Sequence, residues 1–522
     1  MVKIVDENMI NSRKIIFVPA FLAFIIAMLL CFKFSYPISW DIYYHIHMAN
    51  LYLNNGLVFW DYYTVAPSGR LIMYPPLFHL FLGCFSRILN LNVIATSWIA
   101  QPVFSFFLIS VITYAAYKLS NKDVKVAVLT AFMAMMSFAT FNRSVICTPA
   151  TLAIAFSILA CLYYYESYNE HDFKKVIFSS LSFAIICNLH MATAIITMGV
   201  LGLYTLYILL SRQINWRYLL AYILIALIFA TPWWMYVFVN YGLVFNSIAG
   251  GHLRIDEFLI KYYGLIPTLF TLIGFFVLAK KRDNKSIFLI IWSLSIVILS
   301  QVYLIGINTV SIRIFEVSAY PLILIAGIGV SFFFEKINST KLKNTLTILF
   351  ILYSVFSCMA YVDSYTPVLL DDNDYNATIL PDEFHLVFDP VGSILKPSII
   401  SDRYGNESLA HSRYELSRYL IANNISGLIV SEDAIMDTVM VSQTNVSVVY
   451  GGFTESIPEY VVDPVHIVKG WATNEELNKL NVSYLLVKKN TSVPSYATVE
   501  YENDGYKLCK VNVVGQKDEK TI

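Results

Sequence analysis

The chain has 522 residues, 57% of them hydrophobic, and its mean hydropathy is +0.62. The core of a soluble protein could not bury so many apolar residues. Its net charge is zero, but the charges are unevenly distributed. Residues before 363 include 24 Lys and Arg and 13 Asp and Glu, whereas residues from 363 on include 12 Lys and Arg and 23 Asp and Glu. The acidic second part disfavours nucleic acid as a partner, and the seven scattered cysteines form no zinc-type cluster. We predict a multi-pass α-helical membrane domain, residues 1–362, followed by a soluble domain, residues 363–522.

The first domain contains eleven apolar runs that we interpret as membrane crossings. In the loops between them, 17 Lys and Arg fall on one side of the membrane and six on the other. Because basic loops stay in the cytoplasm, the N-terminus is expected inside and the C-terminal domain outside the cell membrane. The predicted crossings are 15–35, 94–117, 126–141, 150–165, 176–189, 191–210, 217–239, 264–279, 286–305, 316–334 and 344–362.

The first outer loop, residues 36–91, is long and rich in aromatic and ionisable side chains. Its last part, 75–91, is apolar, but counting it as a crossing would place the basic loops outside, so we predict a short helix at the outer leaflet. Asp41, His45 and Met48 are spaced to share one helix face. An acidic group this close to the membrane is a functional candidate, and the cap of a surface helix is the alternative.

A set of motifs follows Asp41 in this loop: Asp41-Ile-Tyr-Tyr, Gly56, Trp60-Asp61, Gly69-Arg70 and Tyr74-Pro-Pro-Leu-Phe-His79. The set resembles the first outer loop of C-type (GT-C) glycosyltransferases, and most of all that of archaeal and bacterial oligosaccharyltransferase catalytic subunits. The resemblance implies a membrane transferase with an odd number of crossings, about eleven here, and an outer C-terminal α/β domain. In the family the loop Asp is a catalytic base or metal ligand, and that role falls on Asp41.

Two arginines extend the resemblance. Arg143, in Asn142-Arg143-Ser144, stands where the family has an Arg-containing second outer loop, and Arg313 resembles the Arg that binds the donor phosphate. Guanidinium groups match phosphate oxygens in a bidentate manner, although an Arg reaching from a helix end to the interface would look the same. The second outer loop lacks the family's acidic residues, and the Trp-Trp-Asp-Tyr-Gly (WWDYG) motif is missing, so transfer of a whole glycan to protein Asn is not supported.

Other residues of the outer side are candidates for binding a metal ion or a sugar. His45 and His190, with Asp41, offer ligands for a divalent ion such as Mg²⁺ or Mn²⁺, and Glu257 stands in for a later acidic motif of the family. Hydrogen-bonded structural histidines are the alternative. The aromatic side chains offered for stacking on a sugar are Tyr44, Trp60 and Tyr74, although interfacial aromatic belts are common in membrane proteins.

The second domain alternates strand-like and helix-like runs, which indicates an α/β fold with a partly parallel sheet. Expected strands are 397–402, 426–431, 446–451 and 482–489, with a closing hairpin over 497–512. Expected helices are 411–424, 434–443 and 474–480. Asp402 and Asp433 follow strands. Six Asn-x-Ser/Thr triplets, of the kind that accept N-glycans, begin at Asn376, Asn406, Asn424, Asn445, Asn481 and Asn490.

The combined interpretation is a membrane glycosyltransferase that uses a polyprenyl- or dolichyl-phosphate sugar in the outer leaflet. The acceptor is a glycan, a lipid or a protein. Asp41 is the predicted base and the two arginines are the predicted phosphate ligands. An oligosaccharyltransferase-like enzyme of protein glycosylation, a lipid transporter and a non-catalytic scaffold are the alternatives.

Overall fold

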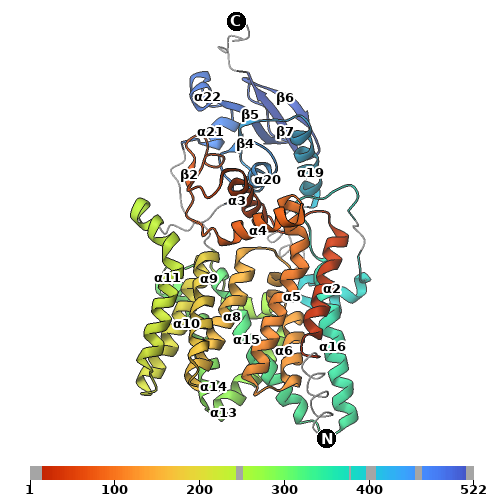
Figure 1. Ribbon diagram of the computed structural model, residues 1–522. Coiled ribbons are helices and arrows are strands. Elements are labelled where there is room, and N and C mark those ends of the chain that lie inside the picture. Colours follow the sequence, from red (N-terminus) through yellow and green to blue (C-terminus); the bar gives the residue numbers. More distant parts are fainter. Residues whose placement is uncertain are drawn as a thin grey trace.

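The computed structural model describes residues 15–242, 251–307, 309–374, 378–394, 407–452 and 461–512. A helical bundle forms one end of the molecule and a mixed sheet the other, with helices α3 and α4 between them (Figure 1). The predicted strand 397–402, Asp402 and the triplet asparagines Asn376 and Asn406 lie outside the described residues.

The bundle consists of long apolar helices, as expected of a multi-pass membrane protein. Seven of the described helices are long and apolar enough to cross a membrane, or nine if each of two bent pairs is one span. α2 and α9, with 16 and 17 residues, are shorter, so the number eleven stays a prediction. The elements are α2 Val18–Lys33, α5 Val93–Leu119, α6 Val124–Met136, α7 Phe138–Ser144, α8 Pro149–Asn169, α9 Phe173–Leu189, α10 Met191–Leu210, α11 Trp216–Tyr241, α12 Ile255–Glu257, η1 Phe258–Tyr263, α13 Leu265–Lys281, α14 Asn284–Gln301, η2 Val302–Ile305, α15 Ser311–Glu335 and α16 Thr340–Asp363.

The predicted crossing 126–141 is interrupted. α6 and α7 meet at an angle of 86°, because Ser137 takes an extended conformation and ends the first helix. The bend leaves Arg143, in the last turn of α7, buried inside the bundle.

The turns with many lysines gather at the end of the bundle away from the sheet. Three of them, α5–α6, α13–α14 and the end of α15, line one cavity of about 570 Å³. Asp123 and Asp283 cap the helices that begin there by accepting backbone N–H groups. The two ends of the bundle therefore differ in charge, as the predicted topology requires.

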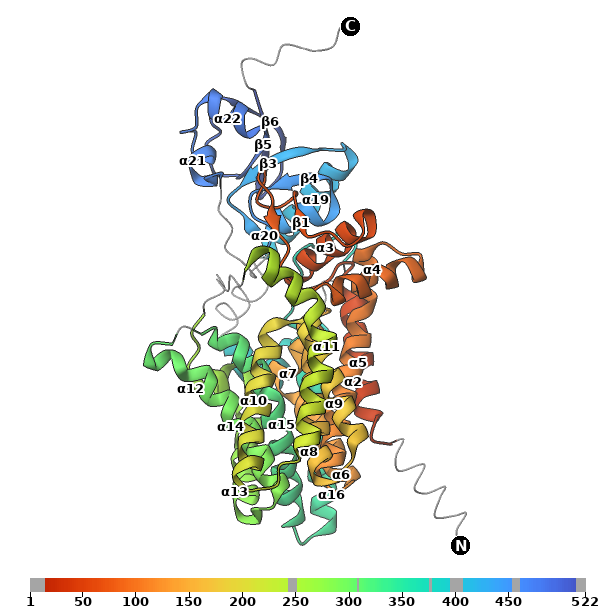
Figure 2. The same cartoon turned by 60° about the vertical axis from the view of Figure 1, so that its left-hand side comes forward.

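Helices α3 (Asp41–Asn55) and α4 (Leu77–Leu89) belong to the loop predicted to be the first outer one. α4 lies across the end of the bundle instead of continuing it (Figure 2). One face of α4 is buried, whereas Leu80, Phe81 and Ile88 on another are exposed. A 13-residue helix with apolar residues on both faces suits a place at the membrane interface, as predicted for 75–91.

The C-terminal part is an α/β unit with a five-stranded sheet in the order β4-β3-β5-β7-β6. β3 runs parallel to β4 and β5, and β7 antiparallel to β5 and β6. The predicted helices 434–443 and 474–480 and the hairpin are confirmed. The division into two domains at residue 363 stays a prediction. The elements are β3 Gly427–Ser431, β4 Val446–Val448, β5 Val482–Lys488, β6 Ala497–Glu502, β7 Tyr506–Val511, α17 Asp382–Phe388, α19 Glu407–Ala422, α20 Ala434–Gln443, α21 Pro464–Val468 and α22 Asn474–Leu480.

The first outer loop is attached to this sheet through main-chain hydrogen bonds. Val448 N–H donates to Tyr63 O (2.8 Å), and Ala66 N–H donates to Val448 O (3.1 Å). Asn50, in α3, donates to Ser442 O at the end of α20 (3.1 Å). The loop is therefore hydrogen-bonded to the edge strand β4, and α3 is held against α20.

Candidate active site

A cavity of about 280 Å³ opens where α3 begins. The start of α3 lies at the end of the bundle nearer the sheet (Figure 1). Its walls come from the starts of α3, α8, α10 and α15 and from the C-terminal unit. The lining residues are Asp41, Tyr44, His45, Tyr74, Thr148, Pro149, Ala150, His190, Ala192, Ile195, Ile196, Leu299, Thr309, Val310, Arg313, Ile314 and Gly452. Asp41 and Arg313, 272 positions apart in the sequence, thus face one cavity.

Asp41 is the first residue of α3, where the positive end of the helix dipole favours its charge. α2 ends at Lys33, whose Nζ lies 3.2 Å from Asp363 Oδ1 in a buried ion pair at the end of α16. That pair fixes the start of the segment that leads to Asp41. Asp41 is half-buried, and its carboxylate shares the cavity with the guanidinium group of Arg313 and the ring of His190.

Glu316 joins the two predicted phosphate-binding arginines. Its Oε2 lies 2.6 Å from Arg143 Nη2 and 3.5 Å from Arg313 Nη1. Arg143 is buried behind the wall, where its Nη1 also donates to Thr148 Oγ1 (3.5 Å). Because Glu316 is engaged more closely by Arg143, the half-exposed Arg313 is the cation that the cavity offers to an anion.

His190 ends α9 and caps α10. Thr193 N–H donates to its Nδ1 (3.3 Å), so the neutral ring carries its proton on Nε2. Burial, followed by the positive charges of Arg313 and Arg143, lowers the pKa of His190 to about 4. At neutral pH the ring is therefore an uncharged hydrogen-bond donor in the cavity wall.

His45 shares a hydrogen bond with His79 of α4, with 2.9 Å between Nδ1 and Nε2. Burial lowers the pKa of both rings well below the ordinary value, and neighbouring positive groups add to the effect. Two neutral imidazoles form such a bond when the N–H of one ring donates to the unprotonated nitrogen of the other. His45 thus connects α3 to α4 and is committed to a histidine partner.

The described residues do not supply a metal site at this cavity. No group of three or more His, Cys, Asp or Glu side chains in the described ranges could hold an ion. Of the predicted ligands, His45 is bonded to His79, and Glu257 pairs instead with Lys261 outside the cavity. The described residues therefore add no support for a Mg²⁺ or Mn²⁺ site formed by Asp41, His45, His190 and Glu257, and the metal ion stays a prediction.

Of the three aromatic side chains predicted to stack on a sugar, two line the cavity and one does not. Tyr44 and Tyr74 line the cavity in an edge-to-face pair with ring centroids 5.9 Å apart. Trp60 does not line it. Its indole lies in the hairpin β1 (Trp60–Asp61) and β2 (Arg70–Leu71), where it donates to Ser68 O. A side chain at Gly69, whose φ is +71°, would come within 2.5 Å of that indole nitrogen, so Trp60 and Gly69 pack as a structural pair.

Asp61 and Arg70, also from the motifs of the first loop, form a buried polar scaffold behind the cavity. Asp61 accepts hydrogen bonds from His47 Nε2 (3.0 Å), Thr64 Oγ1 (2.7 Å) and Tyr63 N–H (2.9 Å). Arg70 Nη2 lies 3.8 Å from Asp61 and donates to Tyr44 OH (3.2 Å). Burial alone would raise the pKa of Asp61, but His47 and then Arg70 outweigh it and lower the pKa below its ordinary value. The scaffold thereby fixes Tyr44 in the wall.

Sequence reasoning missed three members of this site. Glu316 is one of five carboxylates that the predicted topology places on the outer side before residue 363, and nothing in the sequence pairs it with Arg143. Thr148 lies in a stretch that stood out only for its lack of acidic residues, and Gly452 comes from the C-terminal unit. The one available signal was the i, i+3 spacing of Arg313 and Glu316.

Comparison of the sequence with protein-family models and with curated proteins finds no match in either case. The structure, in contrast, is similar to solved membrane enzymes. ArnT from Cupriavidus metallidurans bound to undecaprenyl phosphate superimposes with a TM-score of 0.60 at 11% identity, covering 95% of this chain and 98% of that one. The apo oligosaccharyltransferase of Archaeoglobus fulgidus gives 0.57 at 11%, covering 91% and 69%. The mycobacterial arabinofuranosyltransferase AftD gives 0.58 at 12%, covering 95% and 41%.

The bundle, the long first outer loop and the C-terminal unit therefore form the fold of the C-type glycosyltransferases. The resemblance seen in the motifs of residues 41–79 is confirmed at the level of the fold over more than nine-tenths of the chain.

Proposed function

We propose that this protein transfers a sugar from a polyprenyl-phosphate-linked donor to an acceptor on the extracytoplasmic side of the membrane. The observation that carries the proposal is the meeting of Asp41 and Arg313 in one cavity, at the end of the bundle opposite the basic turns. Basic turns mark the cytoplasmic side, so the cavity would face outward and the N-terminus inward. Chemical labelling from intact cells of a cysteine placed at position 54, and not of one at position 284, checks that orientation.

The ligands recorded for the similar structures support the donor class. The ArnT structure contains undecaprenyl phosphate, and another structure of the Archaeoglobus enzyme contains dolichol-phosphate with an inhibitory peptide. A lipid-linked phosphate here would place its charge beside Arg313. The apolar side chains of Ile195, Ile196 and Leu299 on the same wall would contact its chain.

The chemistry follows from the charges. The Asp41 carboxylate accepts a proton from the acceptor hydroxyl or amide while that atom bonds to the anomeric carbon. The bond between the anomeric carbon and the phosphate oxygen breaks, and its electron pair leaves with the phosphate. Arg313 stabilises that charge, held in place by Glu316 and Arg143. His190 Nε2–H donates to an oxygen of either substrate, and Tyr44 and Tyr74 offer ring faces to the sugar.

The alternatives have less support. A transporter would carry polar groups near the bilayer midplane in broken helices, whereas this cluster lies at one end of the bundle. Transfer of a whole oligosaccharide to protein Asn remains an alternative acceptor chemistry for the same cavity.

The deciding experiment measures sugar release from radiolabelled polyprenyl-phosphate sugars by the full-length protein in lipid nanodiscs. Asp41→Asn should reduce transfer by about 100-fold or more, the contribution of a general base. Asp256→Asn, which changes an exposed outer carboxylate paired with Arg254, should leave transfer unchanged. Equal rates for wild type and Asp41→Asn would refute the proposed base.

A further inference from the structure

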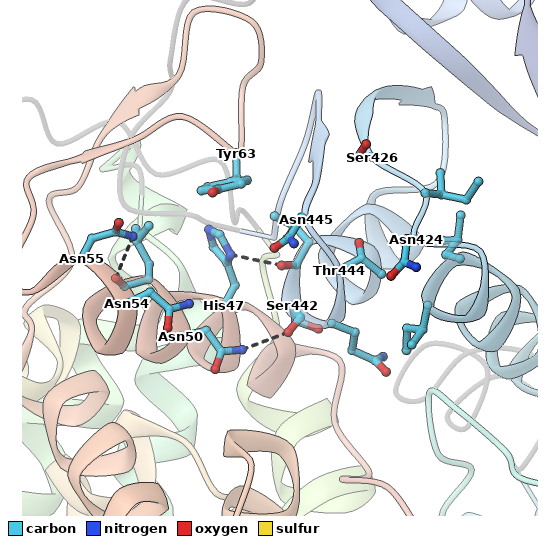
Figure 3. Close-up of a pocket in the computed structure, with 16 residues that line it drawn as sticks. His47, Asn50, Asn54, Asn55, Tyr63, Asn424, Ser426, Ser442, Thr444 and Asn445 are labelled. Atoms are coloured by element: carbon cyan, nitrogen blue, oxygen red, sulfur yellow. Dashed lines mark hydrogen bonds between the residues drawn. The ribbon is translucent and has the colours of Figure 1, made fainter.

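A second cavity, of about 340 Å³, lies between α3 and the C-terminal unit (Figure 3). It is separate from the candidate active site and shares no lining residue with it. Asn50 and Asn54 follow Asp41 by nine and thirteen residues, which places them on the opposite side of α3. Asn54 is roughly 20 Å further along the helix axis. A ligand in this second cavity would therefore not reach Asp41.

The lining of the second cavity is polar and almost free of charge. It contains six amide side chains and no Asp, Glu, Lys or Arg among the described residues. Its one histidine, His47, is already bonded to Asp61 and Val441 O. The lining residues are His47, Asn50, Leu51, Asn54, Asn55, Tyr63, Leu420, Ile421, Asn424, Ile425, Ser426, Val441, Ser442, Gln443, Thr444 and Asn445.

Several of these amides are unused within the protein. In the described part of the chain, the side chains of Asn54, Asn424 and Asn445 form no hydrogen bond, and all three are exposed. Gln443 Nε2 is enclosed without a hydrogen-bond partner there. Each amide has both donors and an acceptor, so free amides around one hollow are suited to a ligand that offers both on neighbouring atoms.

Tyr63 stands over the side of the cavity formed by α3, across from Asn424 and Asn445 (Figure 3). The main chain of Tyr63 is fixed by the hydrogen bond to Val448. Its ring packs edge-to-face on the ring of His47, with 6.0 Å between the ring centroids. A held aromatic ring beside neutral amides matches the two surfaces of a sugar: an apolar C–H face and a rim of hydroxyls. Phosphate or cationic ligands are disfavoured, because the wall provides no opposite charge.

We propose that this cavity binds a neutral oligosaccharide without reacting with it. The inference stands on the lining alone and does not depend on the transfer reaction. In a glycan-modifying enzyme, such a site would hold a part of the glycan distant from the reacting sugar and so keep the protein on its substrate.

The test is calorimetric titration of the full-length protein in nanodiscs with α-mannobiose, cellobiose and N,N′-diacetylchitobiose. At least one of these sugars should bind. Asn54→Ala and Asn445→Ala should each raise its Kd about five- to tenfold, because each variant loses one or two amide hydrogen bonds. Asn423→Ala is the matched control, because the Asn423 amide donates to Tyr419 O of α19 and Asn423 does not line the cavity.

Each of the following outcomes would overturn the proposal. The first is no binding of any of the three sugars at millimolar concentration. The second is an equal loss in Asn423→Ala, or displacement of the sugar by an uncharged Gly-Ser peptide. The third is mass-spectrometric detection of a glycan attached to Asn424 or Asn445, since both begin Asn-x-Ser triplets and the rim would then be a modification site. Binding that survives in Asp41→Asn would separate this site from any failure of the proposed catalysis.

Discussion

Replacing Arg313 with alanine should weaken binding of the lipid-phosphate donor and leave the fold intact. Glu316, the acidic partner of Arg313, would not be left unpaired, because Arg143 Nη2 lies closer to the same oxygen, at 2.6 Å against 3.5 Å for Arg313 Nη1. The variant therefore avoids the cost of a buried uncompensated charge and reports on the ligand.

The size of the expected loss in affinity follows from the exposure of the Arg313 side chain. A hydrogen bond to a charged group contributes about 1.5–3 kcal/mol, and the Arg313 side chain is 33% exposed, which favours the lower part of that range. Arg313→Ala should thus raise the Kd for undecaprenyl phosphate roughly 10- to 30-fold. Arg313→Lys keeps the charge but loses the planar fork, so its Kd should lie between those of the wild type and the alanine variant.

The assay is titration of purified protein with undecaprenyl phosphate, accompanied by thermal unfolding of each variant. Arg254→Ala is the control, since Arg254 is an outer arginine with a 74% exposed side chain paired to Asp256 and does not line the cavity. An unchanged Kd in Arg313→Ala, or an equal loss in Arg254→Ala, would refute the assignment of Arg313 as the phosphate ligand.

Two further predictions concern pH. Because the pKa of Asp61 is lowered in the folded state, its stabilising effect is complete above the unfolded value of about 4 and is lost as pH falls through the folded value. Asp61→Asn should flatten this acid limb in thermal unfolding curves and lower stability at pH 7 by about 3 kcal/mol; an unchanged curve would contradict the scaffold. The pKa of His190 is lowered from 6.5 to about 4 in the folded state. Its contribution to the free energy of unfolding should therefore decrease as pH falls from about 6.5 to about 4, because the unfolded chain takes up the proton first. If its neutral ring serves transfer, kcat/KM should fall as pH approaches about 4, and His190→Gln should remove that limb; a limb that persists in His190→Gln would belong to another group.

The elements that could be predicted from sequence are those with local causes. The helix predicted over 434–443 coincides with α20, because Asp433 provides the cap that starts it and Thr444 returns the chain to an extended conformation. The prediction that 75–91 is not a crossing agrees with the length of α4, which has only 13 residues. The bend at Ser137 was not foreseeable, because a serine within an apolar run is ordinary in a straight helix.

The site was only partly predictable for a similar reason. Asp41 and Arg313 carry their own signals, a loop motif and an outer arginine. Trp60 and Glu257 were predicted to serve the site and do not line it. Trp60 packs on Gly69, and Glu257 pairs with Lys261. The i, i+4 spacing of Glu257 and Lys261 could have indicated their pairing. The pairing of Arg143 with Glu316 depends on the packed fold, because the two residues lie far apart in the sequence.

The backbone pairing of Tyr63 and Ala66 with Val448 has a practical consequence for anyone who would divide this molecule. A fragment containing only the C-terminal unit would leave β4 as a bare edge, ready to pair with other copies and aggregate. The complementary membrane fragment would lose the partner that steadies α3, and with it the placement of Asp41. Chimeras between proteins of this fold should therefore exchange the first loop and the C-terminal unit together.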